Sequence, residues 1–409
     1  MKTFNDFSFS SELRNSIEKL GFEKPTQIQE KTIPLVLEGK DVLGESATGS
    51  GKTLAFGCGI VEKVVPQKGL QALVLTPTRE LAEQVKNTIC EMAGSKKLKI
   101  ISVYGGISIN PQIDDLRRAE VVISTPGRFK DHLQRRTVNT SNITILVLDE
   151  ADRMLDMGFI EDIEFIINKC PKNRQTLFFS ATIPPQIEKL SKRYLKSPIK
   201  ISAEKMVDPE KLEQIYYDVQ RNLKFSLLLH LINKETSKLV MVFCNTRHST
   251  DMIVKSLRAH DVDAIAIHGG FTQNKRNHAI ENFKNGKVGV LVCTDVVSRG
   301  IHIDNISHIY NYEIPKNPVD YVHRIGRTAR AGEDGIVVNL ISEYDHDSFS
   351  SIIREYRSFN IKKIQTPYVE RKMTKQEDSS RSSYGNRNNS ARGRFSHGRR
   401  MQPRHYGRR

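Results

Sequence analysis

Short apolar runs alternate along the chain with longer stretches in which apolar residues recur at helical spacing, as in Arg79 to Met92. A run that is apolar throughout predicts a strand buried on both faces, and strands separated by helices pair in a parallel sheet. The region from Asp41 to about Ile201 therefore predicts a doubly wound α/β domain. Its expected strands are Val42–Gly44, Ala72–Leu75, Ile100–Val103, Val121–Ile123, Ile145–Leu148 and Leu177–Phe179.

A polar segment around Ser202 to Lys211, which contains Pro209, interrupts this alternation, and the same alternation then restarts. Its expected strands are Ile215–Val219, Val240–Phe243, Ala264–Ile267, Val288–Val292, Ile306–Tyr310 and Ile336–Leu340. We therefore predict an α/β fold of two tandem doubly wound parallel-sheet domains, residues 1–205 and 213–368, with a linker over 206–212. A length of 409 residues also suits two cores better than one.

Positive charge is concentrated at one end of the chain. The formal net charge is +16, and residues 371 to 409 hold ten Arg and two Lys against Glu377 and Asp378, a net of +10 that leaves +6 for the rest. This segment has no Leu, Ile or Val, so it cannot bury enough apolar surface to offset the entropy of ordering. We expect residues 369–409 to form a disordered basic tail with a polyanionic partner.

Composition excludes several classes of protein. A hydrophobic content of 38% and a charged content of 27% are typical of a globular protein, and no apolar stretch approaches the roughly 18 residues that span a bilayer. The residues after Met1 show no secretory or transit signal, so we expect a cytoplasmic protein. The cysteines are five, widely spaced and without a C-x-x-C pair, which argues against a disulfide framework or a zinc site and predicts mostly buried thiols.

A glycine-rich loop follows the first expected strand and leads directly into a helical pattern. It reads Ser46-Ala47-Thr48-Gly49-Ser50-Gly51-Lys52-Thr53. In this setting backbone N–H groups close around phosphate oxygens, Lys52 reaches the outer phosphates and Thr53 can bind Mg²⁺. The alternative is a glycine-rich turn before a surface helix, which the order of strand, loop and helix disfavours. We expect a nucleotide-binding P-loop.

Two carboxylates come directly after the buried run Ile145–Leu148, in the sequence Asp149-Glu150-Ala151-Asp152. Asp149 is placed to hold Mg²⁺ through water, and Glu150 to orient or deprotonate an attacking water. An acidic helix cap is the plain alternative, since carboxylates favour helix starts. The P-loop elsewhere in the same predicted sheet favours the catalytic interpretation.

With these two elements, Asp-Glu-Ala-Asp included, the chain resembles the DEAD-box RNA helicases over about residues 4 to 365. The resemblance implies two RecA-like domains, ATP and Mg²⁺ as ligands, and RNA as a partner bound largely through its backbone. It also implies that Phe4 and Gln29 form the adenine-recognising Q motif, with Phe4 stacked on the base. The amide of Gln29 offers one donor and one acceptor, which matches adenine and not guanine.

Further motifs of that family follow expected strands of the first domain, so they gather at the sheet edge where ligands bind. They contribute the RNA-binding candidates Arg79, Gly105, Gly106, Thr125 and Arg128, while Gln273, Arg276 and Thr294 resemble the matching contacts of the second domain. Each taken singly could equally be a helix cap or a tight turn. Ser180 and Thr182 resemble the family's link between hydrolysis and strand separation.

The string His323 to Arg330 resembles the family's arginine motif. Arg327 and Arg330 lie three residues apart and could converge on one phosphate from across the cleft as arginine fingers. A solvated arginine cluster is the alternative. One departure is His302, which stands where the family has a carboxylate that holds the ATP ribose, and we expect altered nucleotide affinity from it.

The sequence therefore predicts an ATP-dependent RNA helicase that unwinds short duplexes or remodels RNA–protein complexes, with Lys52, Asp149, Glu150, Arg327 and Arg330 as its catalytic residues. Two rivals are an ATP-gated RNA clamp with little turnover and a DNA-directed helicase of the same superfamily. The complete catalytic set disfavours the first, and the Q motif disfavours the second. The tail's arginines, interleaved with Tyr384, Phe395 and Tyr406, should add RNA affinity without sequence preference.

Overall fold

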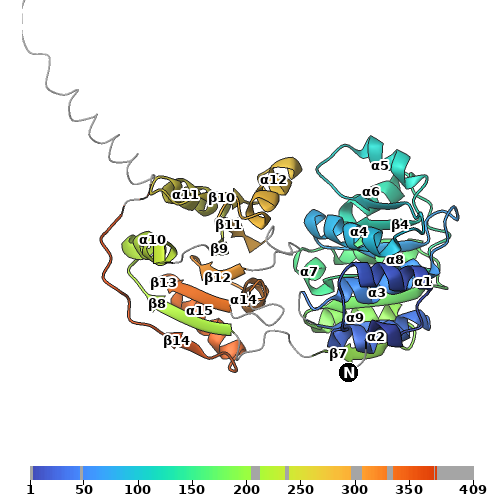
Figure 1. Cartoon of the computed structure of the whole chain (residues 1–409), viewed down its shortest axis with the longest axis horizontal. Coiled ribbons are helices and arrows are strands. Elements are labelled where there is room, and N and C mark those ends of the chain that lie inside the picture. Colours follow the sequence, from blue (N-terminus) through green and yellow to red (C-terminus); the bar gives the residue numbers. More distant parts are fainter. Residues whose placement is uncertain are drawn as a thin grey trace, which may run out of the picture.

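The protein contains two seven-stranded sheets, each covered by helices (Figure 1). The computed structural model describes residues 3–46, 49–203, 212–234, 239–295, 306–328, 335–372 and 374. Neighbouring strands within each sheet run parallel. The predicted class, two tandem doubly wound α/β domains, is confirmed.

The first sheet has the strand order β3-β4-β2-β5-β6-β1-β7. Its strands are β1 (Val42–Glu45), β2 (Ala72–Leu75), β3 (Ile100–Val103), β4 (Val121–Ser124), β5 (Ile145–Leu148), β6 (Gln175–Ser180) and β7 (Ile199–Ser202). Its helices are η1 (Phe4–Asp6), α1 (Ser11–Lys19), α2 (Gln27–Leu37), α3 (Lys52–Lys63), α4 (Arg79–Ala93), α5 (Ile109–Leu116), α6 (Pro126–Gln134), α7 (Ala151–Asp156), α8 (Ile160–Lys169) and α9 (Pro185–Tyr194).

Two apolar layers hold this domain together because successive strand residues point to opposite faces of the sheet. Leu177 and Phe179 pack with residues of α1 to α4 on one face, whereas Phe178 between them packs with residues of α5 to α9 on the other. The central strands are therefore buried on both sides, which explains their uninterrupted apolar sequences.

The second sheet has the order β10-β11-β9-β12-β13-β8-β14. Its strands are β8 (Leu212–Asp218), β9 (Leu239–Cys244), β10 (Ala264–Ile267), β11 (Val290–Thr294), β12 (Ile306–Asn311), β13 (Gly335–Ile341) and β14 (Ile361–Lys363). Its helices are η2 (Arg221–Leu223), α10 (Lys224–Lys234), α11 (Arg247–Arg258), α12 (Gln273–Lys284), α14 (Pro318–Ile325) and α15 (His346–Glu355). Residues of α10 and α11 pack on one face, and residues of α12, α14 and α15 pack on the other.

The two sheets have the same topology. If the strands of each are numbered from its first in chain order, both read 3-4-2-5-6-1-7. The first strand, β1 or β8, thus lies in the interior of its sheet, between the sixth and the seventh. Helices α7 of the first domain and α12 and α14 of the second lie toward the other domain in Figure 1.

The structure differs from the sequence-based expectation at the edges of the sheets. Strands β7 and β14 were not predicted, and both are short edge strands with mostly exposed residues. Strand β11 begins at Val290, two residues later than expected, and Leu212 of the predicted linker belongs to β8. Residues 206–211 of that linker and 375–409 of the predicted tail lie outside the described residues.

Four of the cysteines are buried thiols and Cys90 is an exposed one, as expected. In the part of the chain that the structure describes, none of the helices has the length and apolar character needed to cross a bilayer.

Candidate functional site

The P-loop joins β1 to α3 and is held by its own polar groups. The Lys52 ammonium donates to the Ser46 carbonyl oxygen at 2.8 Å, and the Ser46 and Ser50 hydroxyls are 2.9 Å apart. Gly49 and Gly51 have φ angles of +86° and +88°, a region that side chains rarely adopt. The candidates Ala47 and Thr48 lie outside the described residues, and Thr53 is the second residue of α3.

Asp149 and Glu150 lie at the carboxyl end of β5, and both are buried. Glu150 is a non-glycine residue in the left-handed conformation, with φ +53° and ψ +53°. Such a conformation costs about 1 to 3 kcal/mol and persists where the surroundings enforce it, often at functional sites. It turns the chain sharply at the residue expected to orient water, and it lets the Glu150 amide donate to the Asp149 carboxylate at 3.0 Å.

Burial raises the pKa of Asp149 to about 7, with the charge of Lys52 opposing this rise and the charge of Glu150 adding to it. A nearby cation would favour the ionised carboxylate, so this environment fits a bound Mg²⁺. Within the described ranges no group of three or more His, Cys, Asp or Glu residues is arranged to hold a metal. Mg²⁺ is commonly bound by one or two carboxylates together with substrate phosphates and water. Asp149 and Thr53 are the residues that would hold it.

Of the two Q motif candidates, Gln29 lies beside the P-loop. The amide nitrogen of Gln29 donates to the Gly51 carbonyl oxygen at 3.1 Å, and its amide oxygen accepts from the Thr26 backbone at 2.8 Å. Phe4 packs its ring against Phe22 at a centroid distance of 6.4 Å, and both line a cavity of about 370 Å³. The structure therefore ties Gln29 to the loop, a contact that its sequence position alone did not suggest.

Ser180 and Thr182 meet at Asp152, the last residue of the Asp-Glu-Ala-Asp sequence. The Asp152 amide donates to the Ser180 hydroxyl at 3.0 Å. The Asp152 carboxylate accepts from the Thr182 backbone at 2.9 Å and from its hydroxyl at 3.0 Å. The end of β6 is thus bonded directly to the helix that follows Glu150. Sequence reasoning named Ser180 and Thr182 but did not include Asp152 among the site residues.

The RNA-binding candidates of the first domain surround one cavity of about 410 Å³. Its lining includes Arg79, Gly105, Thr125 and Arg128 of the first domain and Arg276 of the second. Gly106 lies against the Arg79 guanidinium. Burial lowers the pKa of Arg79, as does the charge of Arg276, so several cations converge here. The structure brings these candidates together as expected.

Glu80 connects the two domains next to this cavity. Its carboxylate Oε1 accepts from Arg276 Nη1 at 2.8 Å and from Gln273 Nε2 at 3.2 Å. Gln273 and Arg276 were expected to contact RNA, and here both bind a carboxylate of the other domain. Glu80 was not among the predicted site residues, because a glutamate in the first turn of a helix is common without any such role. A second bridge joins Arg153 of α7 to Asp320 of α14 at 3.3 Å.

The arginine motif lies at the end of α14 and faces the first domain. Arg327 is 2% exposed; burial lowers its pKa, and the charge of Glu150 from the other domain opposes this shift. Burial, followed by the charges of Arg153, Arg327 and Lys52, lowers the pKa of His323 well below its usual value, so that the imidazole is neutral. The candidate Arg330 lies outside the described residues, as does His302.

Arg324 organises the second-domain side of the interface and was not among the predicted site residues. Its guanidinium binds both carboxylate oxygens of Asp295, at 2.6 and 2.7 Å. It also donates to the side chains of Asn245 and Asn311 at 2.8 and 3.1 Å. It therefore links the ends of β9, β11 and β12 with α14, and it fixes the segment that carries Thr294 relative to Arg327.

Comparisons with known proteins agree with this geometry. Residues 26–190 match a family model described as DEAD/DEAH box helicase, and residues 223–332 match the helicase conserved C-terminal domain. The DEAD-box ATP-dependent RNA helicase CshA of Bacillus subtilis is 42% identical over 354 residues, which cover 86% of this chain and 72% of that protein.

Among solved structures, S. cerevisiae Dbp5 bound to RNA and ADP BeF3 is similar with a TM-score of 0.83 at 28% identity, over 94% of this chain and 99% of that one. A DEAD box protein from the hyperthermophile Methanococcus jannaschii is 42% identical, with a TM-score of 0.55 over 88% of this chain and 99% of that one.

Proposed function

Because the chain belongs to the DEAD-box ATP-dependent RNA helicases, we propose that ATP held by its first domain is hydrolysed when Arg327 of its second domain reaches the same site. The protein is an RNA helicase and an RNA-stimulated ATPase, and RNA is its partner. The observation that carries the proposal is the juxtaposition of two buried groups from different domains: Arg327 lies within reach of the charge of Glu150. Neither domain alone holds both.

The orientation of the domains supports a closed, hydrolysing form. Dbp5 bound to RNA and ADP BeF3 superposes with a TM-score of 0.83 although it is only 28% identical, whereas the 42% identical archaeal protein reaches 0.55. A TM-score taken over two rigid domains depends on how they are oriented. The higher score at lower identity supports an orientation of the two domains like that in the RNA-bound protein.

The proposed division of labour follows from burial and charge. Lys52 clamps the outer phosphates of ATP, Glu150 orients the attacking water, and Arg327 stabilises charge that develops on the transferred phosphoryl group. Mg²⁺ bound at Asp149 and Thr53 would neutralise phosphate charge and favour in-line attack. Phe4 and Gln29 contribute adenine recognition, which requires the Gln29 amide to exchange its contact with Gly51 for one with the base.

RNA binding and ATP hydrolysis are coupled through side chains whose hydrogen bonds join different helices and strands. We place the RNA backbone on the cationic cavity formed by Arg79, Arg128 and Arg276, with glycines and Thr125 allowing backbone approach. Closing the domains forms the Glu80 contacts beside that cavity and brings Arg327 to the nucleotide. The bonds of Asp152 to Ser180 and Thr182 transmit the change between β6 and the helix after Glu150. Bending of one RNA strand in the closed form would separate a short duplex.

We also propose the domain division that the sequence suggested, 1–205 and 213–368 with a basic tail over 369–409, adjusted so that Leu212 begins the second sheet. The tail's net charge of +10 supports a tethered, sequence-independent contribution to RNA affinity. We place the protein's action in the cytoplasm, where RNA substrates are abundant.

The substitution Glu150→Gln tests the proposal. It removes the carboxylate while keeping the shape of the side chain, so nucleotide and RNA binding should persist while turnover falls by about 10² or more. Exposed Glu161 on α8 supplies the control, because Glu161→Gln should change nothing. Multiple-turnover ATPase with RNA, and with DNA of the same sequence, gives the readout. An unchanged rate in Glu150→Gln would remove Glu150 from the mechanism, and wild-type turnover below one cycle would favour the clamp.

A further inference from the structure

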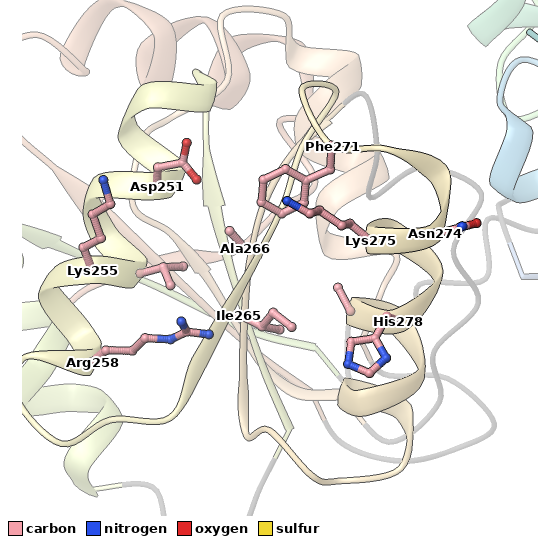
Figure 2. A pocket seen from close by; sticks show the side chains of 11 residues that line it. Asp251, Lys255, Arg258, Ile265, Ala266, Phe271, Asn274, Lys275 and His278 are labelled. Atoms are coloured by element: carbon pink, nitrogen blue, oxygen red, sulfur yellow. The ribbon is translucent and has the colours of Figure 1, made fainter. Parts of the chain in front are cut away.

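One edge of the second sheet is open and lies in a groove between two helices. Among the described residues, strand β10 is the last strand of the sheet on this side and pairs with β11 alone. The groove has a volume of about 670 Å³, with β10 at its floor and α11 and α12 as its walls (Figure 2). Since α11 packs on one face of the sheet and α12 on the other, the groove follows the free edge itself.

The backbone of β10 presents polar groups to this groove. The Ala264 carbonyl oxygen accepts from Arg258 Nε at 2.7 Å, so it points away from β11. In a strand the N–H and C=O of alternate residues point to the same side, so Ala266 directs both groups to the same free edge. An edge of this kind can pair with a further extended chain.

The strand β10 itself contains no lysine or proline against such pairing, and the Ala264 carbonyl is the group on this edge that already accepts from Arg258. Natural edge strands are commonly protected by lysine, proline or bulges. The opposite edge strand β14 ends in Lys362 and Lys363, whereas β10 reads Ala-Ile-Ala-Ile. The groove is also apolar where a strand would lie, since Val254, Ile265 and Phe271 line it. An incoming strand could bury alternate side chains against both walls.

The rim of the groove is cationic. Lys255 and Arg258 project from α11 and Lys275 from α12 (Figure 2). Asp251 is the carboxylate among the lining residues, and it binds His268 at 3.0 Å. A ligand that satisfies this surface needs apolar groups for the floor and negative charges for the rim.

We propose that this groove binds an extended acidic segment of a partner protein, which adds to β10 as an edge strand. Its backbone pairs with Ala266, its apolar side chains pack on Ile265 and Phe271, and its carboxylates meet Lys255 and Lys275. The chain's own tail, with a net charge of +10, does not fit a cationic rim. RNA fits less well than a peptide, because an apolar floor offers nothing to a phosphate backbone.

The probe is a synthetic eight-residue peptide that alternates glutamate with valine or phenylalanine, and its matched control carries lysine in place of glutamate. Both are titrated into the full chain with labelled isoleucine and valine methyl groups. The acidic peptide should shift the methyl signals of Ile265 and Val254, and the lysine peptide should not. Shifts caused by oligouridylate RNA but not by the acidic peptide would show an RNA site and overturn the proposal, as would silence toward both.

Two further comparisons test strand addition and charge separately. Methylating alternate backbone nitrogens of the peptide should abolish binding in one register and spare it in the other, because only one edge of the peptide faces β10. Lys255→Glu and Lys275→Glu should each weaken the acidic peptide by about tenfold. The matched control Lys362→Glu, on the opposite edge strand, should leave its affinity unchanged. RNA-stimulated ATPase should be the same in all three variants. Equal effects of both methylation patterns, or of Lys362→Glu, would refute the edge-strand mode.

Discussion

The two domains place a lysine at the same topological position and use it differently. Lys52 is the first residue of the helix after β1, and Lys224 is the first residue of the helix after β8 and its short 3-10 turn. Both are buried, with 6% and 5% exposure. Lys52 donates to a carbonyl of its own glycine-rich loop, whereas Lys224 forms an ion pair with Asp345 at 2.6 Å.

This difference separates the lysine that borders the P-loop from the lysine that forms an ion pair within its own domain. Burial alone would raise the pKa of Asp345, but the charge of Lys224 and hydrogen bonds from Lys224 and Ser342 hold it below its usual value. The second-domain lysine is thereby committed to a carboxylate of its own domain. The second domain contributes to the proposed site through a different residue, Arg327, which follows α14. On the proposed function, the same strand order provides a binding site in one copy and an activating group in the other.

The largest effect should come from Lys52. Lys52→Ala removes the charge that clamps the outer phosphates, and we expect ATP hydrolysis to fall to background. Steady-state ATPase at saturating RNA, together with circular dichroism to establish folding, measures this. Residual turnover above a tenth of wild type would contradict this prediction. It would mean that Lys52 and Lys224 differ less in their importance for ATP hydrolysis than their different partners suggest.

Arg327 should come next. Arg327→Ala should lower turnover at saturating ATP and RNA by about 10³, because the developing phosphoryl charge loses its partner from the second domain. RNA affinity should change far less. Arg354 on α15 is exposed, and Arg354→Ala serves as the matched control. Turnover within a few-fold of wild type would place Arg327 in a structural role instead.

Substituting Lys224 should lower the stability of the fold and leave ATP hydrolysis unchanged. Lys224→Met leaves Asp345 buried without its cation, so we expect a loss of about 3 kcal/mol in the free energy of unfolding. Urea denaturation measures this loss, and ATPase per folded molecule should be retained. The double variant Lys224→Met with Asp345→Asn should recover part of the stability. A loss of turnover with unchanged stability would reverse the assignment of the two lysines.

The Glu80 bridge joins the domains and should have a moderate effect. Glu80→Gln removes the charge that accepts from Arg276, so the closed form should be less populated and RNA affinity with an ATP analogue should fall about tenfold. Affinity without nucleotide should be unaffected. Fluorescence anisotropy under both conditions distinguishes these cases, and an equal loss in both would assign Glu80 to RNA binding and not to closure.

The smallest effect should appear in the acid sensitivity of the first domain. Burial lowers the pKa of His132 to about 4. The unfolded chain, with an ordinary pKa of about 6.5, takes up the proton first. The stability contribution is thus complete above pH 6.5 and is lost as the pH falls toward 4. The Tm of the wild type should fall when the pH is lowered from 7 to 5. The Tm of His132→Gln should fall by about 2 to 4 °C less over the same range. If the Tm of both proteins changes equally with pH, His132 is not the source of the acid sensitivity.

Strands that are mostly buried could be predicted from the sequence, because burial on both faces leaves a nearly unbroken apolar run. The central strands β2 and β5 and the edge strands β3 and β10 all have the expected bounds. The exposed edge strands β7 and β14 could not be predicted. In β7 and β14 apolar residues are interrupted by lysine and exposed to solvent, and only an adjacent strand makes them strands. Strand order also depends on contacts that no local pattern encodes.

The P-loop and the Asp-Glu-Ala-Asp residues were visible because each is a contiguous string after a strand. Glu80 and Arg324 stand within such strings, but their roles were not visible. Glu80 gains its role only when Gln273 and Arg276, nearly two hundred residues later, are brought against it. Arg324 acts through the ends of three strands. Such partners are a product of tertiary packing, and residue type alone does not reveal them.

The interior position of β1 has a consequence for the newly made protein. β1 is the first strand to be synthesised, yet its neighbours β6 and β7 are the last two of its sheet. The loop after β1 therefore leaves the ribosome about 150 residues before its sheet can close around it. At translation rates of about 5 to 20 residues per second, this amounts to roughly 8 to 30 s in which the glycine-rich segment has emerged but lacks its supporting strands. During that interval the loop lacks both of the strands that flank β1 in the folded sheet, and the second of them, β7, is the last strand of the domain to be made.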